Sequence, residues 1–119
     1  MKKIFIILGI VLLIGILFLL TSTPPISENH GKIDMELFMG NSLNQPLVVG
    51  FGGGGGGNDW SRSYMKSKRD SLIKKGFAIL AIGYFDSGKN TPKYLDRISL
   101  NAIADSILSI ANSNKKIDP

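Results

Sequence analysis

Residues 47–60 read LVVGFGGGGGGNDW, an apolar run followed by six consecutive glycines and the start of a polar segment. Glycine loses more backbone freedom on folding than any other residue, so a run of it is expected where the chain turns sharply or approaches another group closely. Between a strand and a helix, such a run leaves backbone N–H groups pointing outward beside the positive end of the helix dipole. The junction therefore predicts a site for an anion or a developing oxyanion.

The segments on either side of the glycine run predict two parallel strands joined by a helix. Leu47–Phe51 is apolar on both faces, which is typical of the middle of a covered parallel sheet, and a second apolar strand is expected at 77–84. Between them we expect a helix over 59–75, with Asn58 or Asp59 as its N-cap. A strand, a helix and a strand in this order predict a right-handed crossover unit.

The expected helix over 59–75 is strongly basic. Its charged residues are Arg62, Lys66, Lys68, Arg69, Lys74 and Lys75 against Asp59 and Asp70. Gly76 is expected to end the helix in the left-handed conformation. A solvated helix face explains the basic pattern better than attraction to the phosphates of a CoA-type substrate or to an anionic lipid surface. Nucleic acid is not expected as a partner, because aromatic residues do not alternate with the basic ones.

The rest of the chain extends this pattern on both sides. Ile33 to Met39 alternates apolar and polar residues, which predicts a strand with one buried face, and Gly40–Pro46 has the composition of a turn. After the second parallel strand we expect a loop over 85–94 and then a helix that starts near Ser99 or Leu100. The order strand, strand, helix, strand, helix predicts an α/β fold. This pattern calls for one more strand, and we find none at the end of the sequence.

The amino terminus has the pattern of a membrane signal. Ile4–Leu20 is an uninterrupted stretch of apolar residues and glycine that follows Lys2 and Lys3. At about 1.5 Å per residue it nearly crosses a hydrocarbon core of roughly 30 Å. We favour an uncleaved signal anchor over residues 1–22, with the domain on the extracytoplasmic side. The alternative is a cleaved signal peptide and a secreted domain.

The boundary between this signal and the folded domain is expected near Gly31. Residues 23–30 are polar and contain proline, as is typical of a linker, which leaves 31–119 for the domain. The chain has 119 residues and no cysteine, which excludes disulfides and a thiolate zinc site. We expect neither a metal nor a cofactor.

Several segments of the domain resemble one enzyme family. They are Pro46–Gly53, Lys75–Ala81, Gly83–Phe85, Pro92–Leu95, Ile98–Leu100 and Ile117–Pro119. In this order they resemble the α/β-hydrolases of the acyl-CoA thioesterase and bile-acid-CoA:amino-acid N-acyltransferase type, together with dienelactone-hydrolase-like relatives. Members usually follow the Asp-Pro with a short strand and a Gly-x-Ser-x-Gly-like nucleophile turn. The resemblance therefore implies that 31–119 is an incomplete, amino-terminal part of an α/β-hydrolase domain.

The resemblance also implies a site. The hydrolase oxyanion hole takes one N–H from the strand-to-helix loop, here the glycine run, and we expect Gly53 or Gly54 to supply it. The triad residues come later in the family and have no counterpart here, so the chain alone is expected to be inactive. If completed, it would act on a small-molecule acyl ester or thioester. Asp86 could bind substrate, although a turn-forming role explains it better. His30 is expected to be a solvated linker residue.

Two other classes of function stay open. The chain could be a small membrane-anchored protein with a structural or binding role, which requires that its soluble part unfolds cooperatively. It could also be a nucleotide-binding module, although six glycines in a row match almost any glycine pattern and Asp86 lies further on than the acidic residue expected about twenty positions later. A phosphate-binding P-loop is excluded, because Gly57 is followed by Asn58 and not by lysine.

Overall fold

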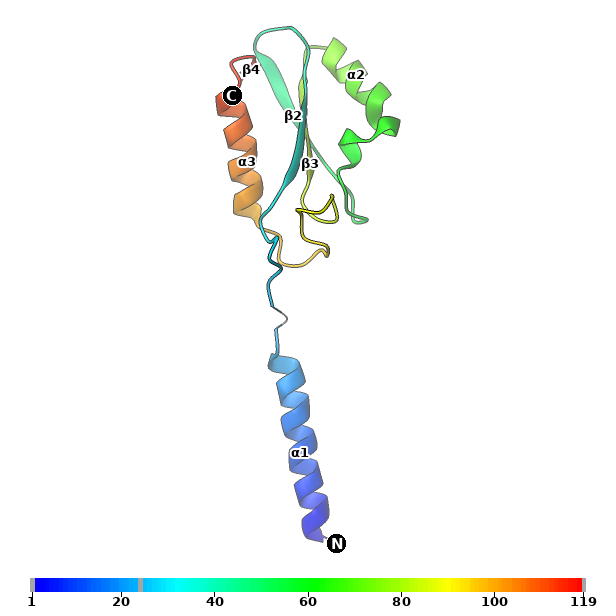
Figure 1. The fold of residues 1–119 in the computed structure, drawn as a ribbon, viewed down its shortest axis with the longest axis vertical. Coiled ribbons are helices and arrows are strands. Elements are labelled where there is room, and N and C mark those ends of the chain that lie inside the picture. The colour runs from blue at the N-terminus through cyan, green and yellow to red at the C-terminus, as the bar shows by residue number, and fades with distance from the viewer. Residues whose placement is uncertain (1, 24, 119) are drawn as a thin grey trace.

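The computed structural model describes residues 2–23 and 25–118, which form one long helix and a small mixed α/β domain (Figure 1). Helix α1 (Lys2–Thr21) stands apart from the domain, and the molecule extends over 82 Å. Within α1, Ile4–Thr21 is long and apolar enough to cross a membrane and is not buried anywhere. The expected N-terminal apolar helix is therefore present. Anchoring, cleavage and the side of the membrane stay predictions.

The domain is built on a four-stranded mixed sheet. Its strands are β1 (Asp34–Phe38), β2 (Gln45–Phe51), β3 (Ala78–Gly83) and β4 (Ile117–Asp118). Their order across the sheet is β1-β3-β2-β4, with β1 antiparallel to β3 and the other pairs parallel. The sheet lies between α2 (Lys66–Lys74) and α3 (Leu100–Ser113), which cover opposite faces (Figure 1). The predicted α/β class and the parallel pairing of the two apolar strands are confirmed.

Strand β3 forms the core of the domain. All six of its residues are buried, because β1 and β2 flank it and a helix covers each face. Ile103 of α3 and Ile117 of β4 complete the buried apolar set on the α3 side, at 9% and 4% exposure. α3 begins where expected, since the Ser99 hydroxyl caps it by accepting a hydrogen bond from the amide of Ala102 at 3.3 Å.

The prediction of one continuous helix over 59–75 is wrong. The chain instead makes two 3-10 turns, η1 (Asp59–Ser61) and η2 (Ser63–Met65), before α2 begins at Lys66. Arg62 is extended between the turns, with φ −67° and ψ 155°. The predicted Asn58 cap is also absent: its side-chain oxygen accepts no hydrogen bond from the described residues, while its side-chain amide donates to the carbonyl of Ala81. The helix does end as predicted, at Gly76 with φ +92°.

The guanidinium of Arg69 holds the broken backbone at this point. It donates to the carbonyls of Trp60 and Arg62, the latter at 2.7 Å, and the Arg62 carbonyl also accepts from the amide of Met65 at 3.1 Å, so the side chain satisfies backbone acceptors that have no regular helical partner. Arg69 is 6% exposed and its guanidinium carbon lies 4.2 Å from the centre of the Phe38 ring. A residue predicted to be part of a solvated basic face is therefore a buried structural residue.

The expectation that no further strand follows the last helix is also wrong. Ile117 and Asp118 pair in parallel with Gln45 and Pro46 of β2. A two-residue strand after a pair of lysines has no periodicity to detect, which explains why the pattern missed it. β2 likewise starts two residues earlier than predicted, at Gln45, which was expected to belong to the turn. The buried side chain of Gln45 accepts from the amide of Gly40 and donates to its carbonyl.

The predicted buried face of the first strand is not seen. β1 is an edge strand that pairs only with β3 among the described residues, and none of its residues is fully buried. Met35, expected to face the core, is 39% exposed. The strand itself lies within the predicted range, so the alternation of apolar and polar residues predicted the element correctly but overestimated its burial.

Candidate functional site

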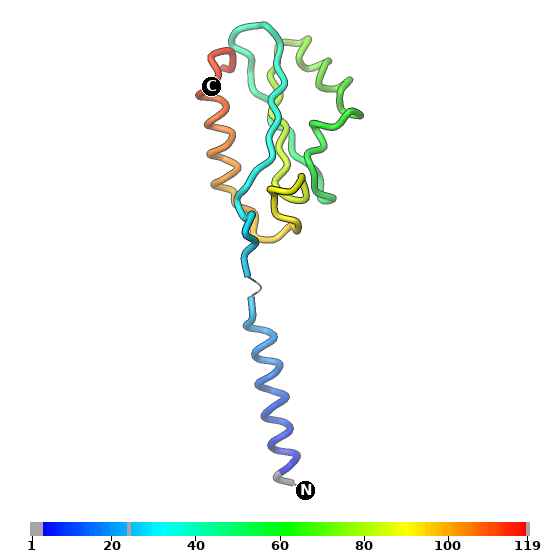
Figure 2. Tube along the Cα trace, in the orientation of Figure 1, coloured from blue at the N-terminus to red at the C-terminus, as the bar shows by residue number. Residues whose placement is uncertain are grey.

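The carboxyl ends of β2 and β3 lie side by side, because the strands are parallel and Phe51 stands opposite Ile82. The chain leaves β2 toward α2 on one face of the sheet and leaves β3 toward α3 on the other (Figure 2). Open α/β sheets bind ligands in the crevice outside such a pair of strand ends. The glycine run follows β2 and the loop containing Asp86 follows β3, so the candidate site lies at this edge.

Four of the six amides in the glycine run already donate hydrogen bonds. Those of Gly52, Gly56 and Gly57 donate to the carbonyls of Ile82, Gly53 and Phe85 at 3.2, 3.1 and 2.9 Å. The amide of Gly53 donates to Oδ2 of Asp59 at 3.3 Å. Gly54 and Gly55 are exposed, and their amides have no partner in the part of the chain that the structure describes. The tip of the run therefore presents two free N–H groups.

The shape of the glycine loop depends on two positions. A Cβ on Gly52 would overlap the carbonyl oxygen of Gly57, where the loop closes on itself. A Cβ on Gly56 would lie 2.7 Å from Cβ of Asp86, and this glycine also has φ +77°. Close approach and positive φ are the two situations in which glycine is required. The loop after β2 is therefore fitted against the loop after β3.

The two predicted oxyanion donors differ in their surroundings. The N–H of Gly54 is free, whereas that of Gly53 holds the carboxylate of Asp59. This carboxylate also accepts a hydrogen bond from the hydroxyl of Tyr64 at 2.8 Å. The loop therefore does bind a negative oxygen, and that oxygen belongs to the chain itself.

The predicted role of the helix dipole at this loop is wrong. An α-helix does not follow the glycines directly, because α2 starts only at Lys66, after η1 and η2. Two three-residue turns supply little aligned dipole. Stabilisation of an anion at the glycine loop therefore comes from individual N–H groups and from nearby side chains such as Arg62.

Hydrogen bonds from Tyr64 and Gly53 lower the pKa of Asp59 below its ordinary value of 3.8, with a further contribution from the charge of Arg62. The charged carboxylate therefore stabilises the fold at pH above that value, and this contribution is lost as the pH falls through the lowered pKa. We expect NMR titration to show the Gly53 amide shifting together with the Asp59 carboxyl. We also expect Tyr64→Phe to raise the pKa of Asp59, because it removes the largest cause.

Tyr94→Phe is the matched control for this titration, because Tyr94 is exposed on a different loop. It should leave the pKa of Asp59 unchanged. An Asp59 carboxyl that titrates at or above 3.8, or a Gly53 amide that does not follow it, would contradict the contact.

Other polar residues gather at the same edge, and sequence reasoning missed them. A pocket of about 300 Å³ is lined by Asp34, Asn58, Ser61, Arg62, Ser87 and Gly88. Ser87 Oγ donates to Asp34 Oδ2 at 2.5 Å, across 53 positions of sequence. Asn58 is 3% exposed and its side-chain oxygen has no hydrogen-bond partner among the described residues. The sheet register brings Asp34, opposite Gly83, to the loop of Ser87, and the segment after the glycine run supplies the other polar groups, so no local signal in the sequence marked them.

Asp86 and His30 lie where a turn and a linker would place them. Asp86 has φ +45° and its amide donates to the carbonyl of Pro92 at 2.7 Å, which fits a turn next to the glycine loop. Its exposed carboxylate is at the candidate edge, so a contact with substrate stays a prediction. His30 is exposed at the end of the linker. No cluster of metal-ligating residues is present within 2–23 and 25–118.

Comparison of the chain with protein-family models, curated proteins and solved structures found no match. The resemblance to α/β-hydrolases therefore stays a prediction from the sequence. The function has to be argued from the geometry at the carboxyl ends of β2 and β3.

Proposed function

We propose that residues 31–119 are the amino-terminal part of an α/β-hydrolase domain of the acyl-CoA thioesterase and acyltransferase type, acting on an acyl ester or thioester. In this proposal the amide of Gly54 donates to the oxyanion of the tetrahedral intermediate. We also infer that α1 anchors the domain to a membrane. The free N–H groups at the tip of the glycine run support the first inference, and the exposed apolar surface of α1 supports the second.

The open edge of β2 is the observation that carries the proposal. β2 pairs with β3 from Leu47 to Phe51, but on its other side it pairs with β4 only at Gln45 and Pro46. A strand continuing β4 in the same register would run along β2 toward the glycine run. At one residue per pair, it would come level with Gly52 about six residues after Asp118. The nucleophile turn of an α/β-hydrolase belongs at the end of such a strand.

In this proposal a nucleophile at that point acts together with the free N–H of Gly54. Oxyanion stabilisation needs donors fixed in advance where the negative charge develops. One donor of this kind contributes roughly 2.7–4 kcal/mol to stabilisation of the transition state. The 3.3 Å contact of Gly53 with Asp59 supports this role, because it shows that an amide of this loop already holds a negative oxygen.

Hydrolysis of p-nitrophenyl butyrate tests the proposal. The purified 119-residue chain is expected to show no turnover above its Gly54→Pro variant, because in this proposal the nucleophile belongs to the strand that would continue β4. The product of the same reading frame continued beyond Pro119 is expected to contain a Gly-x-Ser-x-Gly-like segment within about fifteen residues and to hydrolyse the ester. In that product Gly54→Pro should lower kcat by about 10²–10³, because proline removes the N–H.

Lys68→Ala, on the exposed face of α2, is the control and should leave kcat unchanged. Three results would each overturn the proposal: turnover by the 119-residue chain above the Gly54→Pro level, a continued frame without the nucleophile segment, or a Gly54→Pro variant of the active product with unchanged kcat.

A further inference from the structure

The linker-facing loop, residues 89–98, lies between β3 and α3 at the end of the domain that faces α1 (Figure 1). Two hydrogen bonds tie it to the linker. Asn29 Nδ2 donates to the carbonyl of Lys89 at 3.3 Å, and Arg97 Nη2 donates to the carbonyl of Pro25 at 3.3 Å. The loop is therefore held beside the segment that leads from α1 into the domain.

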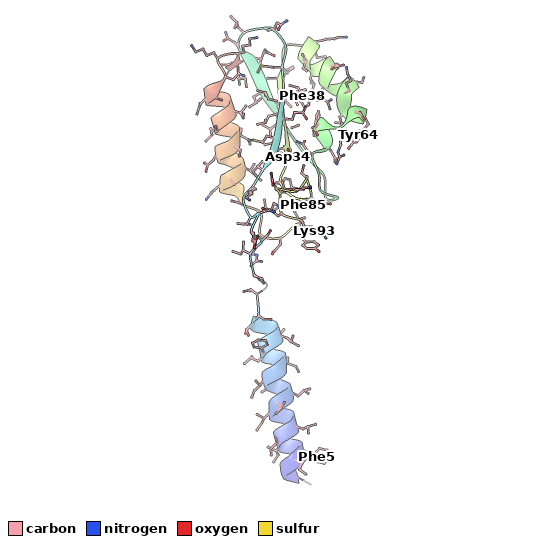
Figure 3. The ribbon with its side chains drawn as sticks, viewed as in Figure 1. Phe5, Asp34, Phe38, Tyr64, Phe85 and Lys93 are labelled. Atoms are coloured by element: carbon pink, nitrogen blue, oxygen red, sulfur yellow. The ribbon has the colours of Figure 1, made fainter. Side chains whose placement is uncertain are left out.

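The linker-facing loop exposes large apolar side chains next to basic ones. Tyr94 is 70% exposed, Leu95 52% and Ile98 43%, and Ile26 of the linker beside them is 58% exposed. Figure 3 shows Lys93 at the same end of the domain, and its Nζ lies 5.5 Å from the centre of the Tyr94 ring. Aromatic and aliphatic side chains mixed with lysines are typical of surfaces at the membrane–water interface.

A groove separates the linker from this loop. Its volume is about 570 Å³, and apolar atoms contributed by Pro25, Ile26, Pro92 and Tyr94 account for much of its wall. Exposure of such an apolar surface to water is unfavourable, and its transfer into an apolar layer would lower the free energy.

The positive charge of the loop rests on two lysines. Arg97 pairs with the only acidic residue of the loop, Asp96, with Nε 3.0 Å from Oδ2. Lys89 and Lys93 are exposed and have no ion-pair partner in the described part of the chain. Two lysines near an anionic surface would each gain electrostatic energy that neutral lipid cannot supply.

The length of the linker brings this loop close to the end of α1. α1 ends at Thr21, and the carbonyl that holds Arg97 belongs to Pro25, four residues later. Four residues span at most about 14 Å even when fully extended. The headgroup layer outside the hydrocarbon core is itself roughly 5–8 Å thick on each side, and charges act over about 8–10 Å in physiological salt. A membrane that holds α1 is therefore within reach of the loop.

We propose that the linker-facing loop is a membrane-contact surface, in which Lys89 and Lys93 bind the phosphates of anionic phospholipids while Tyr94 and Leu95 enter the headgroup layer. This inference rests on the proposed anchoring of α1. The contact would hold the domain down on the bilayer and fix the direction in which the glycine loop faces.

Hydrogen exchange of the full chain in lipid nanodiscs tests the contact. Nanodiscs of pure phosphatidylcholine are compared with nanodiscs in which roughly one-third of the lipid is phosphatidylglycerol. We expect amides 93–98 to exchange more slowly in the anionic nanodiscs. Lys89→Glu with Lys93→Glu should abolish this difference, since each lysine near the surface contributes about fivefold in binding, or about 30-fold for the pair.

Lys68→Glu with Lys75→Glu is the matched control, because it makes the same change of charge on exposed lysines of the α2 region and should keep the protection. Equal exchange in both nanodiscs, or loss of protection in the control, would overturn the contact. Resistance of the chain to alkaline extraction from phosphatidylcholine vesicles reports separately on α1. A chain that stays inserted but shows no lipid-dependent protection contradicts the contact alone, and a chain that is extracted contradicts the anchor.

Discussion

Arg69→Ala is expected to lower the free energy of unfolding by about 3 kcal/mol, measured by urea titration of the full chain in detergent with the fluorescence of Trp60, its single tryptophan. The variant loses two hydrogen bonds from a charged group to the carbonyls of Trp60 and Arg62, each worth about 1.5–3 kcal/mol. It also loses the contact with Phe38. Removing a buried charge recovers some desolvation energy, so the net loss falls at the low end of this sum.

Two further variants separate the causes. Arg69→Met keeps most of the side-chain packing, so any loss of stability in it reports on the hydrogen bonds. Lys68→Ala changes the neighbouring exposed cation on the same helix and should stay within about 0.5 kcal/mol of the parent. An Arg69→Ala variant as stable as Lys68→Ala would mean that the guanidinium does not hold the 3-10 turns in place.

The elements that the sequence predicted correctly are those with strong local signals. The apolar run of β3, the left-handed end of α2 at Gly76 and the capped start of α3 at Ser99 follow from composition and spacing alone. The elements that were predicted wrongly depend on contacts distant in sequence. The break at Arg62, between η1 and η2, is held by Arg69, which reaches back over seven and nine residues, and β4 pairs only with the edge that β2 offers.

The candidate site shows the same division. The glycine run marked the loop after β2, and a free amide at Gly54 agrees with its predicted exposure. The capture of the Gly53 amide by Asp59 was not predicted, because the sequence pattern indicated for Asp59 only the role of a helix N-cap and not of a partner for the glycine loop. The pocket that contains Asp34 and Ser87 depends on how the antiparallel edge strand is placed in the sheet, which no local pattern encodes.

Gly50→Ala is expected to destabilise the domain by about 2 kcal/mol, through the ring of Trp60. Gly50 lies inside β2, opposite Ala81 of the core strand, and the indole covers it. An added Cβ would overlap Cγ of the ring and lie 2.6 Å from Cδ1 and Cδ2. The ring cannot move away freely, because Arg69 binds the carbonyl of the same residue. Overpacking of this kind costs about 1–3 kcal/mol, against less than about 1 kcal/mol gained from the stiffer unfolded chain.

Gly55→Ala is the matched control, because it makes the same chemical change where a Cβ would meet nothing within 4 Å. We expect it to be neutral or slightly stabilising. Far-UV circular dichroism should follow both unfolding transitions, since the emission of Trp60 will itself change in Gly50→Ala. If Gly50→Ala unfolds at the same urea concentration as Gly55→Ala, the indole does not pack on β2.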